Sequence, residues 1–213
     1  MPIARQGLKF VGAGILAAGA GLLMRPAPGL DFLGALIFFL GLFFAAFSLY
    51  FFRDPHRPWP PDAGLIYSPG DGTVLSVSRE GAGKPVCVRI FLSIFNVHVQ
   101  RSPCSGQVET VEHIPGSFVM AMKDGAKANE RCVMTLRADN DGHRLVVEQI
   151  AGAVARRIEC WPAPGSALKA GERYGIIYFG SQAALHLPDS ARALVKPGDK
   201  VSAGVTPVAE WLK

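Results

Sequence analysis

Two long uncharged stretches near the start of the chain constrain its fold more than any other feature. Residues 32–52 form a run of 21 residues without a charged side chain, which is long enough for a helix to cross a bilayer core of about 30 Å. Residues 10–24 form a second run of 15 residues, which would extend about 22 Å as a helix. The proline- and glycine-containing segment 25–31 lies between them and predicts a tight turn. We therefore expect residues 1–52 to be a membrane anchor folded as a two-helix transmembrane hairpin.

The charges that flank this hairpin predict its orientation. Arg5 and Lys9 precede the first run, Arg53 and Arg57 follow the second, and the turn between them carries one arginine and one aspartate. Positive residues favour the cytoplasmic side of a membrane. Both ends of the anchor, and the domain that follows, are therefore expected on the cytoplasmic face of the cell (inner) membrane.

Two alternatives to the hairpin are open from sequence alone. The first run is short enough for a signal peptide, but the second run is too long for the apolar region of one. If the first run lies in the interface instead of crossing, the domain that follows would be on the opposite side.

Four glycines in the first run allow close helix approach; they are Gly12, Gly14, Gly19 and Gly21.

The remainder of the chain has the pattern of a mainly β domain. Residues 53–64 are rich in proline and predict an extended linker. From residue 65 to 213, short apolar stretches alternate with Gly, Pro and Asp, which predicts strands bounded by turns. The clearest of these stretches are 73–77, 86–92, 107–111, 132–136, 145–147 and 175–179, with a hairpin turn at 140–142. Only residues 152–160 show a helical period.

A short pattern occurs twice and suggests the kind of β fold. Residues 168–175 and 195–201 both contain a lysine, a glycine two positions later, and then an acidic and a basic residue. Such turns recur in lipoyl-like modules, where glycine supplies the positive φ. We expect a lipoyl-like β-sandwich or barrel.

Composition limits the partners and metals of this domain. The net charge of +5 suits an anionic partner, and because no Lys/Arg-rich run of the nucleic-acid type is present, we expect lipid and no nucleic acid. Four cysteines are spaced by 17, 28 and 28 residues without a C-x-x-C pair. This spacing predicts no zinc or other metal site and no redox motif, but reduced cysteines.

Chemistry is suggested by one of three Gly-Ser dipeptides. Those at 116–117 and 165–166 lie in proline-containing turns, whereas Gly180-Ser181 ends the apolar stretch 176–179 and leads into another. A glycine before a serine within a strand permits a strained, close approach of hydroxyl to backbone. Taken alone, the dipeptide is more simply a small residue at a bulge.

Blocks in fixed order give this dipeptide a context. Together they resemble the short prokaryotic branch of the pyruvoyl-dependent phosphatidylserine decarboxylases, with Gly70 where that family usually has alanine. The blocks are SPGDGTV at 68–74, FLSIFNVHVQRSP at 91–103, HIPGSF at 113–118, NER at 129–131, QIAG at 149–152, ARRI at 155–158 and FGS at 179–181.

The resemblance implies a self-cleaving zymogen of phospholipid biosynthesis. The chain would break between Gly180 and Ser181, giving a β chain that ends at Gly180 and an α chain, 181–213, that remain together as a heterodimer. Ser181 would become a covalently bound pyruvoyl cofactor. That group would form a Schiff base with phosphatidylserine and promote its decarboxylation to phosphatidylethanolamine.

Catalytic partners of Ser181 follow from the same blocks. A serine needs a nearby base to attack a carbonyl, and His98 and Asp71 are the candidates for base and orienter. The longer branch of the family has a second histidine where this chain has Arg101. His98 could therefore serve in cleavage, in decarboxylation, or in both. Strand alternation places the spare candidate His186 on the face opposite Ser181.

Four basic residues are candidates for contact with the lipid phosphate or carboxylate. They are Arg101, Lys123, Lys127 and Arg131, and each is equally well interpreted as a solvated surface charge.

Two rival functions are a membrane-tethered carrier module and a pyruvoyl enzyme acting on a soluble amino acid. The first leaves the ordered blocks unexplained and the second leaves the hairpin unexplained. The oligomeric state is open, and a homo-oligomer is compatible with the sequence.

Overall fold

The computed structural model describes residues 2–59, 62–79, 85–119, 128–140, 142–152, 157–178 and 181–212. The chain divides into two compact units, Met1–His56 and Arg57–Lys213. Arg57 therefore belongs to the second unit, although it lies in the stretch predicted to be a linker.

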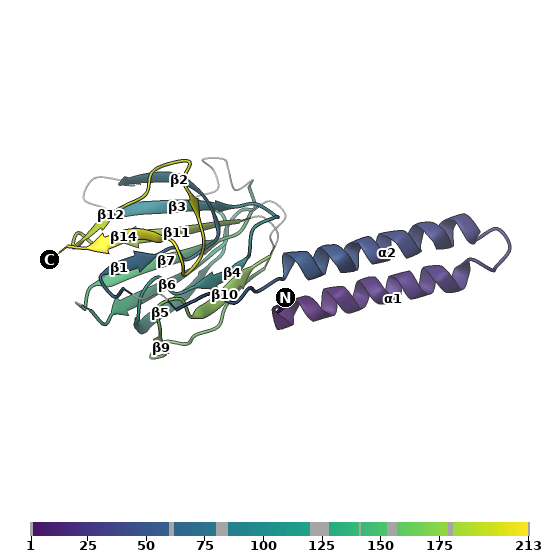
Figure 1. The fold of residues 1–213 in the computed structure, drawn as a ribbon, viewed down its shortest axis with the longest axis horizontal. Coiled ribbons are helices and arrows are strands. Elements are labelled where there is room, and N and C mark those ends of the chain that lie inside the picture. Colours follow the sequence, from purple (N-terminus) through teal and green to yellow (C-terminus); the bar gives the residue numbers. More distant parts are fainter. Residues whose placement is uncertain are drawn as a thin grey trace. The chain divides into compact units, whose positions relative to one another are not determined.

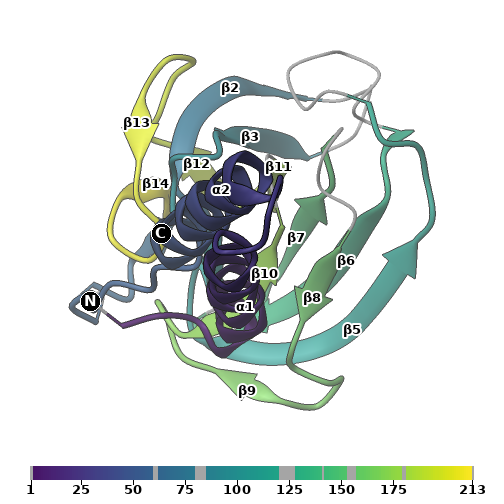
Figure 2. The ribbon, with the colours of Figure 1, turned by 90° about the vertical axis from the view of Figure 1, so that its right-hand side faces the viewer.

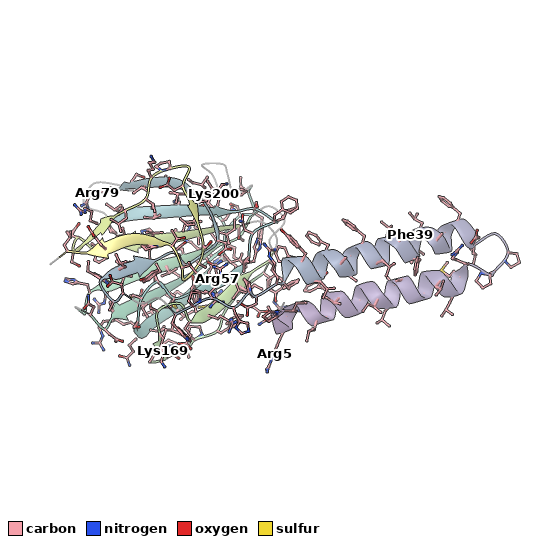
Figure 3. The ribbon with its side chains drawn as sticks, viewed as in Figure 1. Arg5, Phe39, Arg57, Arg79, Lys169 and Lys200 are labelled. Atoms are coloured by element: carbon pink, nitrogen blue, oxygen red, sulfur yellow. The ribbon has the colours of Figure 1, made fainter. Side chains whose placement is uncertain are left out.

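The first unit contains the two predicted helices. A 3-10 turn, η1 (Arg5–Gly7), leads into α1 (Leu8–Met24), and α2 (Asp31–Phe51) follows the turn. Both helices are long and apolar enough to cross a membrane. Phe39 is 66% exposed and points away from α1 (Figure 3), as expected for a side chain that contacts lipid.

Glycines bring the two helices of this unit close together. A Cβ atom added to Gly14 would lie 2.7 Å from the backbone nitrogen of Ala45 and 2.8 Å from the carbonyl oxygen of Gly41. Farther along, a Cβ atom on Gly34 would lie 2.7 Å from the carbonyl oxygen of Gly21. Of the four glycines predicted to allow this approach, Gly14 and Gly21 do so. The other two, Gly12 and Gly19, face open space.

The second unit is built from antiparallel strands in three sheets. The largest has eight strands in the order β13-β2-β3-β11-β7-β6-β5-β9, and two three-stranded sheets have the orders β1-β14-β12 and β4-β10-β8. The strands are β1 (Leu65–Tyr67), β2 (Gly72–Arg79), β3 (Val86–Leu92), β4 (Val99–Arg101), β5 (Gly106–Ile114), β6 (Arg131–Ala138), β7 (Arg144–Ile150), β8 (Ile158–Cys160), β9 (Ala167–Leu168), β10 (Arg173–Ile177), β11 (Ser181–Leu187), β12 (Ala191–Ala193), β13 (Lys200–Val201) and β14 (Pro207–Trp211).

The eight-stranded sheet curls into a half-barrel around one apolar core (Figures 1 and 2). Alternate residues of β3, β6, β7 and β11 face this core, including Ile90, Leu136, Leu145 and Leu185. Because side chains alternate along a strand, the intervening residues of β11 and its neighbours lie on the other face. The mainly β prediction is thus confirmed, whereas a lipoyl-like fold stays a prediction.

Residues 158–160, the end of the stretch predicted to have a helical period, form a strand instead. This strand is β8, and residues 153–156 lie outside the described part of the chain. Antiparallel pairing of β8 with β10 fixes an extended backbone there. Tertiary pairing thus overrides the local helical period.

The repeated lysine–glycine pattern forms the same turn in both places. Gly171 and Gly198 have φ values of 76° and 95°, the left-handed region that glycine adopts readily. In each turn the backbone N–H of the lysine donates to the carboxylate three residues later, at 2.8 Å for Lys169–Glu172 and 2.9 Å for Lys196–Asp199.

Candidate active site

Ser181 opens the central strand of the half-barrel. It pairs with Leu92 at the end of β3, and its neighbour Gln182 pairs with Ile150 at the end of β7. Ser181 is fully buried, and its hydroxyl oxygen has no hydrogen-bond partner among the described residues. Leaving a buried hydroxyl unpaired costs about 1–3 kcal/mol, so such an atom needs a functional or structural reason. Gly180, its predicted cleavage partner, lies outside the described residues.

His98 lies beside the strand that leads to Ser181. Its carbonyl oxygen accepts a hydrogen bond from the backbone nitrogen of Ile177 at 3.3 Å, four positions before Ser181. The imidazole is buried, and its Nδ1 atom lies 3.0 Å from the carbonyl oxygen of Asn96. A carbonyl oxygen only accepts hydrogen bonds. Nδ1 therefore carries the proton, and in the neutral ring Nε2 is the basic nitrogen.

Asp71 is buried against an arginine rather than a histidine. Its two carboxylate oxygens accept hydrogen bonds from Arg57 at 2.7 and 2.8 Å, and the backbone N–H of Ala203 donates to Oδ1 at 2.8 Å. The position expected for Asp71, next to Nδ1 of His98, is taken by the carbonyl of Asn96. A catalytic role for Asp71 stays a prediction.

The Gly70 position brings the three predicted blocks together. A Cβ atom at Gly70 would lie 3.0 Å from Oε1 of Gln100 and 3.3 Å from Cβ of Ala183. Gln100 is two residues after His98, and Ala183 is two residues after Ser181. The block that contains Asp71 thus packs against β11, which begins with Ser181, and against β4, which follows His98. With alanine at this position, the side chain of Gln100 would have to give way slightly.

The predicted substrate contacts lie in different surroundings. Arg101 is buried, and its guanidinium donates to the carbonyl oxygen of Gly171 at 3.0 Å. Arg131 begins β6 with its side chain 27% exposed and its Nε atom 3.9 Å from Glu148. Lys123 and Lys127 lie outside the described residues. Contact of any of these four with substrate stays a prediction.

A polar cluster on the other face of the sheet was not predicted from the sequence. His186 Nε2 lies 2.7 Å from the Glu148 carboxylate and 3.9 Å from the Cys87 thiol. Burial by itself would lower the pKa of His186, but these two contacts raise it to about 10. His186 is therefore a cation at neutral pH and unsuited to act as a general base. Strand alternation predicted this face for His186, but its partners Glu148 and Cys87 are remote in sequence and have no local signal.

Comparison with known proteins identifies the family. The family model described as phosphatidylserine decarboxylase matches residues 44–209. The chain is 44% identical over 210 residues to a protein of Symbiobacterium thermophilum, covering 96% of this chain and 93% of that protein. It is 37% identical over 212 residues to one of Desulfotalea psychrophila (97% and 95% covered) and 41% identical over 215 residues to one of Burkholderia mallei (98% and 94% covered). All three relatives carry the name phosphatidylserine decarboxylase proenzyme. The chain therefore belongs to the phosphatidylserine decarboxylase family.

Proposed function

We propose that the chain is a proenzyme that cleaves itself between Gly180 and Ser181 and then decarboxylates phosphatidylserine to phosphatidylethanolamine. The buried Ser181 hydroxyl, without a hydrogen-bond partner among the described residues, carries this proposal. A buried hydroxyl that no other described group engages can turn toward the carbonyl of the preceding peptide, and a nearby base would activate it for attack.

The self-cleavage follows from the position of this hydroxyl. Oγ of Ser181 attacks the carbonyl carbon of Gly180, and the peptide bond becomes an ester as the amide nitrogen takes the proton. Loss of a Cα proton and breakage of the Cβ–Oγ bond then release Gly180 as a carboxylate. The dehydroalanine left at position 181 takes up water and loses ammonia, which leaves a terminal pyruvoyl group. His98, with Nε2 as its basic nitrogen, is the base that we assign to the first step.

The strand pairing explains how the two products would stay together. After cleavage, the fragment 181–213 would keep four strands. Three of them pair with strands of the other fragment, and β12 pairs with β14 within its own fragment. Pairing joins β11 to β3 and β7, β13 to β2, and β14 to β1. The α and β chains would therefore remain one folded heterodimer with the new terminus held at the centre of the sheet.

The residues around Ser181 fit the chemistry of a pyruvoyl group. Such a group supplies a ketone that condenses with a primary amine and accepts the electrons released with carbon dioxide. The buried position 181 would give that carbonyl surroundings of low polarity, and His98 is the group that we assign to deliver a proton to the substrate α carbon. Arg131 and the predicted contacts Arg101, Lys123 and Lys127 are proposed to hold the anionic head group.

The helices and their flanking charges support a membrane location for this reaction. We assign residues 1–52 as the membrane anchor, with the catalytic domain on the cytoplasmic face of the inner membrane. The helices are long and apolar enough to cross, and the substrate named for the relatives is a bilayer lipid.

Intact mass spectrometry of the purified full chain tests the proposal. The expected products are residues 1–180 and residues 181–213, the latter with a pyruvoyl terminus. Ser181→Ala should stay uncleaved and leave phosphatidylserine in vesicles unchanged. Ser166→Ala, in the Gly165-Ser166 dipeptide of a surface turn, is the matched control and should cleave normally. Decarboxylation by an uncleaved Ser181→Ala chain would overturn the mechanism.

A further inference from the structure

The turn that joins β3 to β4 presents two large apolar side chains to solvent. Ile94 is 39% exposed and Phe95 is 63% exposed, although the central positions of tight turns usually hold Gly, Pro, Asn, Asp or Ser. The Asn96 carboxamide oxygen accepts hydrogen bonds from the Ser93 backbone N–H at 2.9 Å and the Ser93 hydroxyl at 2.8 Å. The Asn96 N–H donates back to the Ser93 carbonyl oxygen at 2.9 Å. The turn is therefore held firmly, with its apolar pair outward.

This turn adjoins the candidate active site on both sides. It begins after Leu92, which pairs with Ser181. It ends at Asn96, whose carbonyl oxygen lies 3.0 Å from Nδ1 of His98. The exposed pair and the two reacting residues therefore belong to the same end of the sheet.

A short stretch of chain connects α2 to the block that contains Asp71. Five residues, 52–56, separate the end of α2 from Arg57, so the chain can extend only about 20 Å between them. Arg57 is bonded to Asp71, which immediately precedes β2. The start of β2 pairs with Phe91 near the end of β3, one residue before Leu92.

We propose that Ile94 and Phe95 insert into the head-group layer of the bilayer that holds the substrate. This inference rests on the proposed function, because a lipid substrate brings the site to a bilayer surface. Aromatic and aliphatic side chains gain free energy in that layer. Two side chains are too few for a stable protein interface, which needs about 1,000 Å² or more, whereas a bilayer accepts a small apolar tip.

Kinetics on two forms of the substrate test this role. The double variant Ile94→Ser/Phe95→Ser should be cleaved like the parent chain. Its KM for phosphatidylserine in phosphatidylcholine vesicles should rise about tenfold, while its rate on short-chain, monomeric phosphatidylserine stays within about twofold. An equal loss on both substrates, or an unchanged KM on vesicles, would overturn the proposal.

Leu212→Ser is the matched control. Leu212 is 50% exposed and lies away from the end of the sheet that holds Ser181. Its neighbour Trp211 lines a cavity with Asp139 and Asn140, which follow the last residue of β6. Removing this apolar side chain should leave the KM on vesicles unchanged. A rise equal to that of the double variant would show a general surface effect and would also overturn the proposal.

Fluorescence separates this inference from the proposed function. Phe95→Trp and Leu212→Trp are placed in the uncleavable Ser181→Ala chain, reconstituted in nanodiscs that contain brominated phosphatidylcholine. The indole introduced at position 95 should be quenched beyond the background of the three native tryptophans, and the one at position 212 should not. Absence of that extra quenching overturns the insertion. Failure of the proposed function would instead leave the parent chain uncleaved and phosphatidylserine intact, without changing this optical result.

Discussion

The guanidinium of Arg57 lies against both carboxylate oxygens of Asp71, at Nη–O distances of 2.7 and 2.8 Å. The two side chains are only 10% and 12% exposed, and Arg57 also donates to the carbonyl oxygen of Ala203. Figure 3 shows Arg57 among the strands of its unit. This ion pair fixes the beginning of the second unit to the turn before β2, so Arg57 is a structural residue and not a free charge of a linker.

Breaking this pair should destabilise the protein from either side. Asp71→Asn or Arg57→Gln leaves a buried charge unpaired, which costs about 3 kcal/mol. Urea unfolding of the uncleavable Ser181→Ala chain should show this loss for each variant, and the double variant should lose less than the sum of the two. Fully additive losses would show that the two side chains are not coupled.

The same two variants test whether Asp71 also takes part in cleavage. In the chain that retains Ser181, a purely structural pair predicts that both substitutions slow cleavage to the same small extent on a denaturing gel. A direct role for Asp71 predicts that Asp71→Asn arrests cleavage while Arg57→Gln does not. The comparison is informative because both variants lose the same contact.

His98 should be far more important for chemistry than His186. Replacing a general base lowers a rate by about 10²–10⁴-fold, so His98→Gln should slow cleavage by at least about 100-fold in a time course after cell-free synthesis. His186→Gln should cleave within about threefold of the parent, because His186 lies on the other face of the sheet and is bonded to Glu148. Equal effects of the two substitutions would contradict the assignment of His98.

Local patterns predicted the strands well where a short apolar run is bounded by polar residues. The stretch 86–92 has the predicted bounds of β3, because an apolar run of this length, interrupted only by Arg89, favours a buried strand. The predicted stretch 175–179 overlaps β10, which ends at Ile177, and Phe179 lies outside the described residues. The helical period over 152–160 was misleading for residues 158–160, which form β8. Their pairing with β10 joins residues that are distant in sequence, so a local pattern does not show it.

Site contacts were less predictable because they join distant parts of the chain. Ser181 and His98 were found through ordered motifs, but the partner of the His98 ring is a backbone carbonyl, which has no sequence signature. The Asp71–Arg57 and Glu148–His186 pairs span 14 and 38 residues. Many charged residues of the chain could have served as partners at such separations, so only the folded backbone selects among them.

The Glu148–His186 pair should make stability depend on pH. Burial raises the pKa of Glu148, but the hydrogen bond from His186 and nearby positive charges outweigh it and leave this pKa below its ordinary value. Folding raises the pKa of His186 to about 10. The histidine's contribution is therefore complete below its unfolded pKa of about 6.5 and is lost as pH rises through about 10. The carboxylate's contribution is lost as pH falls through its lowered pKa.

Unfolding experiments on the Ser181→Ala chain can measure this dependence. Glu148→Gln should be less stable than its parent at pH 7, and the difference should become smaller between pH 9 and about 10.5 as His186 loses its charge. It should not vanish, because Glu148 also interacts with Arg131 and Arg89. Titrating groups remote from this cluster cancel in the difference because both chains contain them. A difference that is constant across this range would show that the His186 charge does not depend on Glu148.

The helical hairpin offers a test in which two glycines of one helix serve as variant and control. Gly14→Val would place side-chain atoms where a Cβ atom already lies 2.7 Å from the backbone of α2, whereas Gly12→Val meets nothing within 4 Å. Close backbone approach is the main source of packing energy between such helices in lipid. Gly14→Val should therefore lower the thermal stability of the detergent-solubilised chain. Gly12→Val should leave it unchanged, and equal effects of the two valines would show that helix propensity rather than contact decides the outcome.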